Sequence, residues 1–165
     1  MGQFLYPPPN LEPVAIYNDG GGLVEKYKEA AFQYRMEGRE VRINGSCRSA
    51  CVLALSVPNV CVSPGAVVKA HQAYETYSGI ERPDVTAQMM DSLPRAIRNR
   101  LEPNIRREYW SGSILDYHQL VRLGIRPCGS NMGKYRVAEV THASLPERNP
   151  RTKTKITPVT GLIKL

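Results

Sequence analysis

Residues 44–54 have the sequence NGSCRSACVLA, and the fold of the surrounding chain depends on this stretch. Residues 41–43 before it, Val-Arg-Ile, are typical of a short β-strand. Residues 50–55 after it are too apolar for a surface, so they predict the start of a buried helix. The sequence therefore predicts a strand, a glycine turn and a helix, with Ser49 at the junction.

A serine at this junction has two interpretations. On a strand–turn–helix unit its hydroxyl projects beyond the end of the strand, and the backbone N–H groups that follow point toward it. The same residue can also be a plain N-cap of a buried helix. The first interpretation depends on which other motifs the chain brings to this turn.

The spacing of apolar residues predicts the elements around the turn. A strand at 14–17 is followed by glycines at 20–22, a helix at 23–37 and the strand at 41–43, an order that favours a parallel pair with a right-handed crossover. Further strands are expected at 60–62 and 66–70, and further helices at 84–92, 95–101 and 116–123.

His71 follows directly after the predicted strand at 66–70. A histidine at a strand end is most often structural or solvated. Two successive strand ends can, however, bring Ser49 and His71 to one edge of a sheet. A neutral imidazole there could accept the proton of the serine hydroxyl.

The length of 165 residues and the ordinary apolar content predict one domain, at 14–128, between a proline-rich arm at 1–13 and a basic extension at 129–165. The extension contains one expected strand, at 135–140. The net charge of +7 suggests an anionic partner but says nothing about fold. No apolar run has the length of a membrane helix, and the first residues lack signal-peptide features, so we expect a cytoplasmic protein that does not bind membranes.

The four cysteines are expected to be reduced, because nothing in the sequence indicates secretion. They are interpreted as small buried hydrophobic residues. The alternative is a zinc site that combines Cys47 and Cys51 with His71 or Cys128, but no CxxC spacing supports it and we expect no metal.

Two nucleotide-related interpretations are weaker. The glycines at 20–22 match neither GxGxxG nor a GK[ST] motif, so phosphate binding is not expected there. The arginines within 95–107 are typical of a solvated helix face, and few aromatic residues are interleaved with them. We therefore do not expect nucleic acid as a partner.

Three stretches together resemble the Clp-type serine peptidases: NDGGGLV at 18–24, GSCRSAC at 45–51 and VKAHQ at 68–72. The CxSAC form of the serine turn is similar to a branch of small bacterial and phage Clp-like proteins. The resemblance covers about residues 14–128. It implies an α/β fold of the Clp/crotonase type, a superhelix of β-β-α turns, truncated at the N-terminus. The sheet would then be completed by another chain or by the C-terminal tail.

The resemblance also implies roles for individual residues. Ser49 would be the nucleophile and His71 the general base, while the backbone N–H of Ala50 and that of Gly21 or Gly22 would form the oxyanion hole. The third, acidic member is open. Counting back from Gly124 favours Glu108, and the alternatives are Asp91 and Asp116.

The function implied is a serine endopeptidase that hydrolyses polypeptides without a cofactor. Such a protein would be a homo-oligomer, with an unfoldase ATPase as a candidate partner. One alternative is a catalytically inactive Clp-fold assembly or scaffold subunit, for example a phage structural protein. Another is a crotonase-type enzyme acting on acyl-CoA, which would use backbone N–H donors and would not need Ser49.

Overall fold

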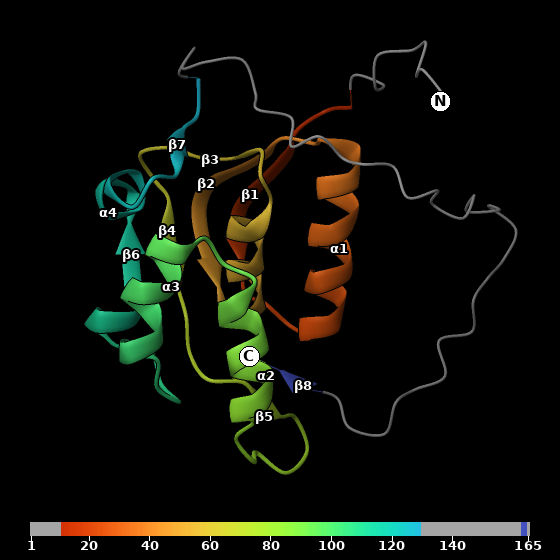
Figure 1. The fold of residues 1–165 in the computed structure, drawn as a ribbon, viewed down its shortest axis with the longest axis vertical. Helices are drawn as coiled ribbons and strands as arrows, with labels where there is room; N and C mark the ends of the chain where they lie inside the picture. Colours follow the sequence, from red (N-terminus) through yellow and green to blue (C-terminus); the bar gives the residue numbers. More distant parts are fainter. Residues whose placement is uncertain (1–10, 130–162, 165) are drawn as a thin grey trace, which may run out of the picture.

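The structure, a computed structural model, describes residues 11–129 and 163–164 (Figure 1). The strands are β1 (Val14–Asp19), β2 (Val41–Arg48), β3 (Val60–Val62), β4 (Val67–Lys69), β5 (Tyr74–Glu75), β6 (Ile114–Asp116), β7 (Arg126–Pro127) and β8 (Ile163–Lys164). The α-helices are α1 (Val24–Glu37), α2 (Pro83–Asp91), α3 (Arg95–Leu101) and α4 (Tyr117–Arg122). The 3₁₀ helices are η1 (Ser49–Ser56), η2 (Glu102–Asn104) and η3 (Ser111–Ser113). Most of the predicted N-terminal arm and the strand predicted at 135–140 lie outside the described residues.

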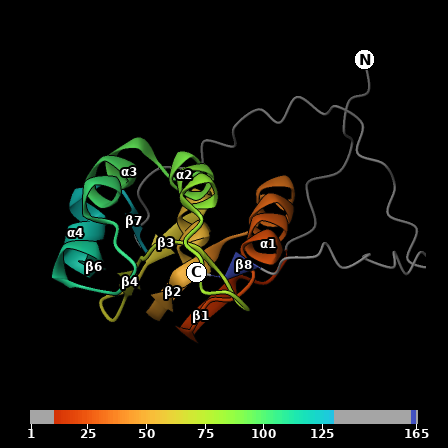
Figure 2. The ribbon, with the colours of Figure 1, turned by 90° about the horizontal axis from the view of Figure 1, so that it is seen from below.

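The protein has a mixed α/β fold built on a curled sheet. The strand order is β6-β4-β2-β3-β7, and β1 also pairs with β2. The β1–β2 pair is parallel, as the order of strand, helix and strand predicted, and only the β4–β6 pair in this sheet is antiparallel. Figure 2 shows α1, α2 and α3 together on one side of the strands. The coarse α/β prediction is therefore confirmed.

The glycine turn predicted after the strand at 41–43 is wrong, because β2 continues through residues 44–46 to Arg48. The first half of β2 pairs with β3 and the second half with β4, so this strand is the centre of the sheet. Gly45 permits this continuation. A side chain at this position would overlap with the backbone carbonyl of Tyr17 in β1, where the β1–β2 register shifts. Glycine in a strand often marks such a close backbone approach.

The helices follow their predicted positions closely. The observed α1 ends at Gly38, whose φ of 62° is in the left-handed region that favours glycine after a helix. The core gathers apolar side chains from β2, η1 and the helices around them, including Ile43, Leu53 and Met89. None of the helices in the described part of the chain is both long and apolar enough to cross a bilayer.

The C-terminal extension contributes one described element. Its strand β8 pairs antiparallel with β5, with Lys164 opposite Tyr74. This pair forms a separate two-stranded sheet, so β8 does not extend the main sheet. Figure 1 shows β8 next to β5, beside the lower end of α2.

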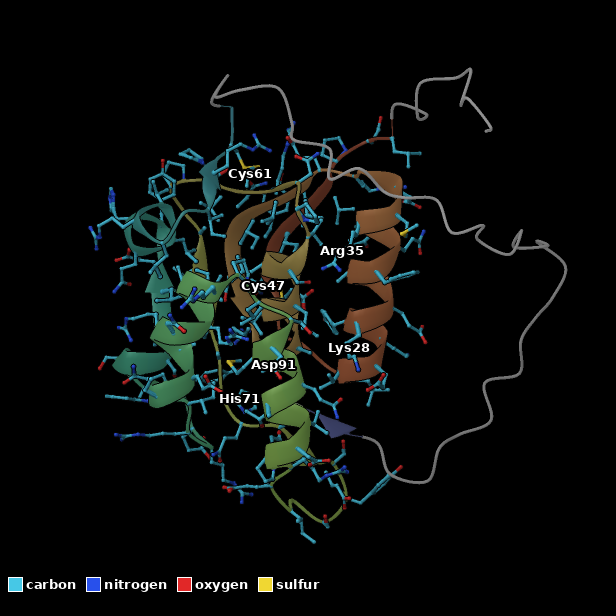
Figure 3. All side chains as sticks on the ribbon, in the orientation of Figure 1. Lys28, Arg35, Cys47, Cys61, His71 and Asp91 are labelled. Atoms are coloured by element: carbon cyan, nitrogen blue, oxygen red, sulfur yellow. A yellow bond between two sulfur atoms is a disulfide. The ribbon has the colours of Figure 1, made fainter. Side chains whose placement is uncertain are left out.

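All four cysteines are paired, which corrects the expectation of reduced thiols. One disulfide joins Cys47 to Cys51, and the other joins Cys61 of β3 to Cys128, just after β7. Figure 3 shows Cys61 near one end of the molecule and Cys47 at its middle. These bonds occupy every cysteine sulfur, so no thiolate remains for the zinc site considered from the sequence. Because disulfides are rare in the cytosol, these bonds do not fit the cytoplasmic compartment expected from the sequence.

Glu40 links the start of β2 to β7, and it yields a prediction on acid stability. Its carboxylate accepts hydrogen bonds from Arg42 and from Arg126, the latter at 2.9 Å. Burial works against the charged form, but the two arginines outweigh it and lower the pKa of Glu40. A lowered carboxyl pKa adds stability above the ordinary glutamate value, about 4.3, and this stability is lost as the pH falls through the folded-state pKa.

Replacing Glu40 with glutamine is therefore expected to lower the free energy of unfolding by about 1–2 kcal/mol near neutral pH. The deficit should shrink in acid, where the wild-type carboxylate is protonated. Urea unfolding across this pH range measures it. The exposed Glu29→Gln variant is the control. A deficit for Glu40→Gln that does not change with pH would contradict the role of the ionised carboxylate.

Candidate active site

Ser49 lies at a sharp turn between β2 and η1. Its φ is 63°, the one positive value among the described residues other than glycine. Such a conformation is uncommon for a residue with a side chain, and a strained turn between a strand and a helix is the geometry of a nucleophile elbow. The apolar residues of η1 are buried, which holds the turn in place. Ser49 itself is only 1% exposed.

His71 reaches Ser49 because their strands are neighbours. The second half of β2 pairs in parallel with β4, so that Arg48 is opposite Lys69. Parallel neighbouring strands end at the same edge, and the residues that follow them meet there. The Nε2 atom of His71 lies 3.1 Å from Oγ of Ser49, and both side chains are buried. In the tautomer with an unprotonated Nε2, the hydroxyl donates to the imidazole.

Two tyrosines surround the imidazole. The ring of Tyr109 contacts the His71 ring edge-on at 4.8 Å between centroids, and the ring of Tyr74 lies 5.8 Å away. The Tyr109 hydroxyl is hydrogen-bonded to Ser49. Burial raises the pKa of Tyr109, against the opposing effects of this hydrogen bond and of the Arg48 charge. The hydroxyl therefore stays protonated near neutral pH.

Tyr109 belongs to an irregular loop at residues 105–110, between η2 and η3. The backbone N–H of Gln72 donates to the carbonyl of Arg106 at 2.8 Å, and that of Ala70 donates to Ser113 at 3.0 Å. These bonds hold the loop along the segment that carries His71. Sequence reasoning missed Tyr109, because a loop without periodicity gives no signal of what it packs against.

The glycine turn packs directly onto the serine. Gly21 has a φ of 81°, and a Cβ atom there would overlap with Cβ of Ser49 and lie 2.7 Å from the carbonyl oxygen of Arg48. Asp19 holds the turn, since its Oδ1 accepts from the Gly21 N–H at 2.8 Å and from the Tyr27 hydroxyl at 2.6 Å. Burial, followed by the interaction with this carboxylate, raises the pKa of Tyr27.

The predicted oxyanion donors differ in their availability. The N–H of Gly21 is engaged by Asp19, so in this conformation it does not face a ligand. No hydrogen bond is found for the N–H of Gly22 within the described residues. Ala50 is in the first turn of η1, where backbone N–H groups have no acceptor inside the helix. Of the two glycines considered from the sequence, Gly22 is thus the better placed donor.

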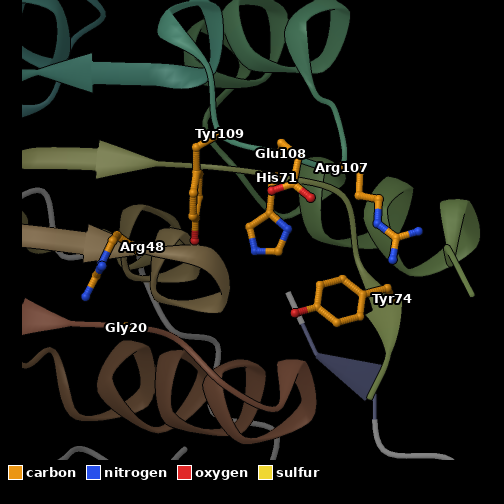
Figure 4. A pocket seen from close by; sticks show the side chains of 7 residues that line it. All are labelled: Gly20, Arg48, His71, Tyr74, Arg107, Glu108 and Tyr109. Carbon is orange, nitrogen blue, oxygen red and sulfur yellow. The ribbon is translucent and has the colours of Figure 1, made fainter. Parts of the chain in front are cut away.

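Of the three acids considered from the sequence, only Glu108 lines the same pocket as His71 (Figure 4). Its side chain is exposed. Asp91 instead pairs with Arg98 at 3.2 Å. Asp116 caps α4 by accepting from the N–H of Gln119 at 2.8 Å. Both aspartates thus have other partners, and neither lines the pocket.

The pocket beside this pair of residues has a volume of about 440 Å³. It is lined by Gly20, Arg48, His71, Tyr74, Arg107, Glu108 and Tyr109. Figure 4 shows the His71 imidazole between the two tyrosines, with the arginines on opposite sides of it. The site thus combines a buried hydroxyl and imidazole with aromatic walls and charged ends.

The Cys47–Cys51 disulfide spans the serine turn. It joins the end of strand β2 to the start of η1, with 5.3 Å between the two Cα atoms. Both residues are fully buried. The CxSAC pattern contains both cysteines, four positions apart. The bond was not predicted from the sequence because the thiols were expected to be reduced. The disulfide limits how far the two sides of the turn can separate.

No family model matches this chain, and no curated protein shows significant similarity to it.

The fit between Gly21 and Ser49 gives a prediction with a matched control. A Gly21→Ala change should shift the serine turn, and a displacement of about 1 Å can cost about 100-fold in a reaction rate. Gly38 also has a positive φ, but a Cβ there would meet nothing within 4 Å. Gly38→Ala therefore adds the same kind of backbone strain without the overlap.

The measurement is the rate at which a fluorophosphonate probe reacts with Ser49 in each variant. We expect about 100-fold slower reaction in Gly21→Ala and an unchanged rate in Gly38→Ala. Equal rates in the two variants would mean that the contact between the glycine turn and the serine does not matter for reactivity.

Proposed function

We propose that this chain is a Clp-like serine endopeptidase with a Clp/crotonase-type fold. The observation that supports the proposal most is the 3.1 Å contact between Oγ of Ser49 and Nε2 of His71, at a serine with a positive φ. A serine next to a base, on a strained turn that begins a helix, is the arrangement of an activated nucleophile. The three sequence motifs that resemble the Clp peptidases contribute the serine, the histidine and the glycine turn.

In the proposed reaction, Oγ of Ser49 attacks the carbonyl carbon of a peptide bond while Nε2 of His71 takes the hydroxyl proton. The N–H groups of Ala50 and Gly22 donate to the negatively charged oxygen that develops, and each such donor is worth about 3–4 kcal/mol of barrier. The protonated imidazole then gives its proton to the leaving amine. Water attacks the acyl-enzyme in the second half, with His71 again as the base, and Ser49 is released.

Tyr109 has to move for this reaction, because its hydroxyl is hydrogen-bonded to Ser49. The arriving peptide carbonyl would replace that hydrogen bond. Tyr109 is 39% exposed and lies on a loop, so it can rotate away without breaking the core. Glu108, on the same loop, is the proposed acidic partner of His71.

The proposal includes a homo-oligomer and a polypeptide substrate, with an unfoldase ATPase as a further partner. A second candidate, an inactive subunit of an assembly, is favoured by one observation: Ser49 is only 1% exposed. The two candidates differ in whether Ser49 reacts.

Covalent labelling with a fluorophosphonate probe tests the proposal. The wild-type chain should form an adduct on Ser49, which mass spectrometry of the digested protein locates. Ser49→Ala should remove the adduct, and the exposed Ser78→Ala should keep it. A wild-type chain that forms a stable oligomer but is labelled no more than Ser49→Ala would support the inactive subunit instead.

A further inference from the structure

The pocket beside Ser49 carries more positive than negative charge. Two arginines, Arg48 and Arg107, line it together with a single carboxylate, Glu108. Neither arginine belongs to an ion pair in the part of the chain that the structure describes. Five other arginines of the described residues are in ion pairs, for example Arg98 with Asp91 and Arg126 with Glu40. Within the described residues, no ion pair therefore neutralises either of these two cations.

Arg48 is the more constrained of the two. It is partly buried, and its Nη2 donates to the amide oxygen of Asn18 at 3.3 Å. Its Nε is buried and has no hydrogen-bond partner among the described residues. A desolvated cation without an anion is costly, and the guanidinium fork fits a carboxylate with two parallel hydrogen bonds. Gly20 lines the pocket beside this guanidinium, and a Cβ atom there would lie 3.7 Å from Nη2 of Arg48.

Arg107 lies at the other end of the pocket. Its guanidinium is 6.0 Å from the centre of the Tyr74 ring, and the side chain is exposed. Figure 4 shows His71 between the two arginines. A ligand that passes over the reacting pair would therefore meet a cation on either side of it, and the partly buried Arg48 would be the stronger contact.

The geometry points to a pocket that binds the carboxylate of an acidic side chain in an extended polypeptide, with Arg48 as its main contact. This inference rests on the proposed function and gives its substrate class: peptides with a glutamate or aspartate close to the bond that is cleaved. The Glu108 carboxylate in the same pocket would repel an acidic side chain, so it should weaken the preference for acidic peptides.

The experiment measures binding, which does not depend on turnover. Two sets of short, fluorescently labelled, alanine-rich peptides carry either one glutamate or one glutamine, moved through every position. Their affinities for the full-length Ser49→Ala chain are measured by fluorescence anisotropy at low salt. We expect the best glutamate peptide to bind about tenfold more tightly than its glutamine counterpart, as for a single charge-assisted contact.

Variants assign that preference to the pocket. Arg48→Met should remove it, Arg48→Lys should retain part of it, and Glu108→Gln should increase it. Arg122→Met is the matched control, because Arg122 is an exposed arginine of α4 that does not line the pocket. It should leave the preference unchanged. Equal affinities for the glutamate and glutamine peptides, or a preference that survives in Arg48→Met, would overturn the inference.

The outcome is separable from that of the labelling experiment. An adduct on Ser49 without any glutamate preference would remove the acidic substrate class and leave the peptidase intact. A preference that depends on Arg48, in a chain that the fluorophosphonate does not label, would keep the carboxylate pocket and remove the peptidase.

Discussion

Replacing His71 with glutamine is expected to slow the reaction of Ser49 with a fluorophosphonate by about a thousandfold, in the middle of the range for a lost general base. Glutamine has a similar size and can hydrogen-bond to Oγ, but its amide cannot accept a proton. The wild-type rate should fall in acid as the imidazole becomes charged. The variant should lose that dependence, which a purely structural role for His71 would not produce.

The control for this change is His118→Gln. His118 is exposed on α4 and contacts Tyr117 rather than the pocket, so its replacement should leave the labelling rate unchanged. Thermal unfolding of both variants separates chemistry from folding, because His71 is buried between Tyr74 and Tyr109 and its loss also removes packing. If His71→Gln folds and reacts within a few-fold of the wild-type rate, the imidazole is not the base.

The meeting of Ser49 and His71 could be predicted because it depends on strong local signals. Each residue comes after a predicted strand with branched apolar side chains, and residues that follow neighbouring parallel strands meet at one edge of the sheet. The rule that consecutive strands pair did not apply, because β3 and β4 each pair with β2 and not with one another. The structure adds that the part of β2 that pairs with β4 is its second half, which begins in the stretch predicted as a turn. The prediction of proximity was thus right although the predicted length of β2 was wrong.

The error at residues 44–46 has a physical cause. Asn, Gly and Ser in sequence are typical of turns when only local propensity is considered. Here Gly45 instead allows the carbonyl of Tyr17 to approach, a contact between β1 and β2 that the local sequence does not encode. The contact between Gly21 and Ser49 is also not encoded locally. Only the structure shows that a side chain at Gly21 would overlap with Ser49.

The pocket walls could not be predicted, since they come from a segment without periodicity. Tyr109 and Arg107 follow α3 and η2 in an irregular loop, and hydrogen bonds to the backbone near His71 determine its position. Arg48 is part of the CRSAC motif, but only the structure shows that no carboxylate of the described residues forms an ion pair with it. These residues are the ones that would distinguish one substrate from another.

Removing the Cys61–Cys128 disulfide is expected to lower the free energy of unfolding by about 4 kcal/mol, from the entropy of a closed loop of this length. The bond joins residues 67 positions apart and ties β3 to the end of β7. The Cys47–Cys51 bond spans only four positions, so the same reasoning gives about 2 kcal/mol. Urea unfolding of the Cys61→Ser/Cys128→Ser and Cys47→Ser/Cys51→Ser double variants measures both values.

For the reactivity of Ser49, in contrast to stability, removal of the Cys47–Cys51 bond should have the larger effect of the two. The Cys47–Cys51 bond closes the serine turn itself, so its removal should slow fluorophosphonate labelling by about tenfold even where the chain stays folded. Figure 3 shows Cys61 near one end of the molecule and Cys47 at its middle, so removal of the Cys61–Cys128 bond should leave the labelling rate of the folded chain unchanged. Thiol titration of the unfolded, unreduced protein tests the premise, because four free thiols there would return the cysteines to the reduced state expected from the sequence. A larger loss of stability for the short loop than for the long one would show instead that native-state packing, and not loop closure, decides what these bonds contribute.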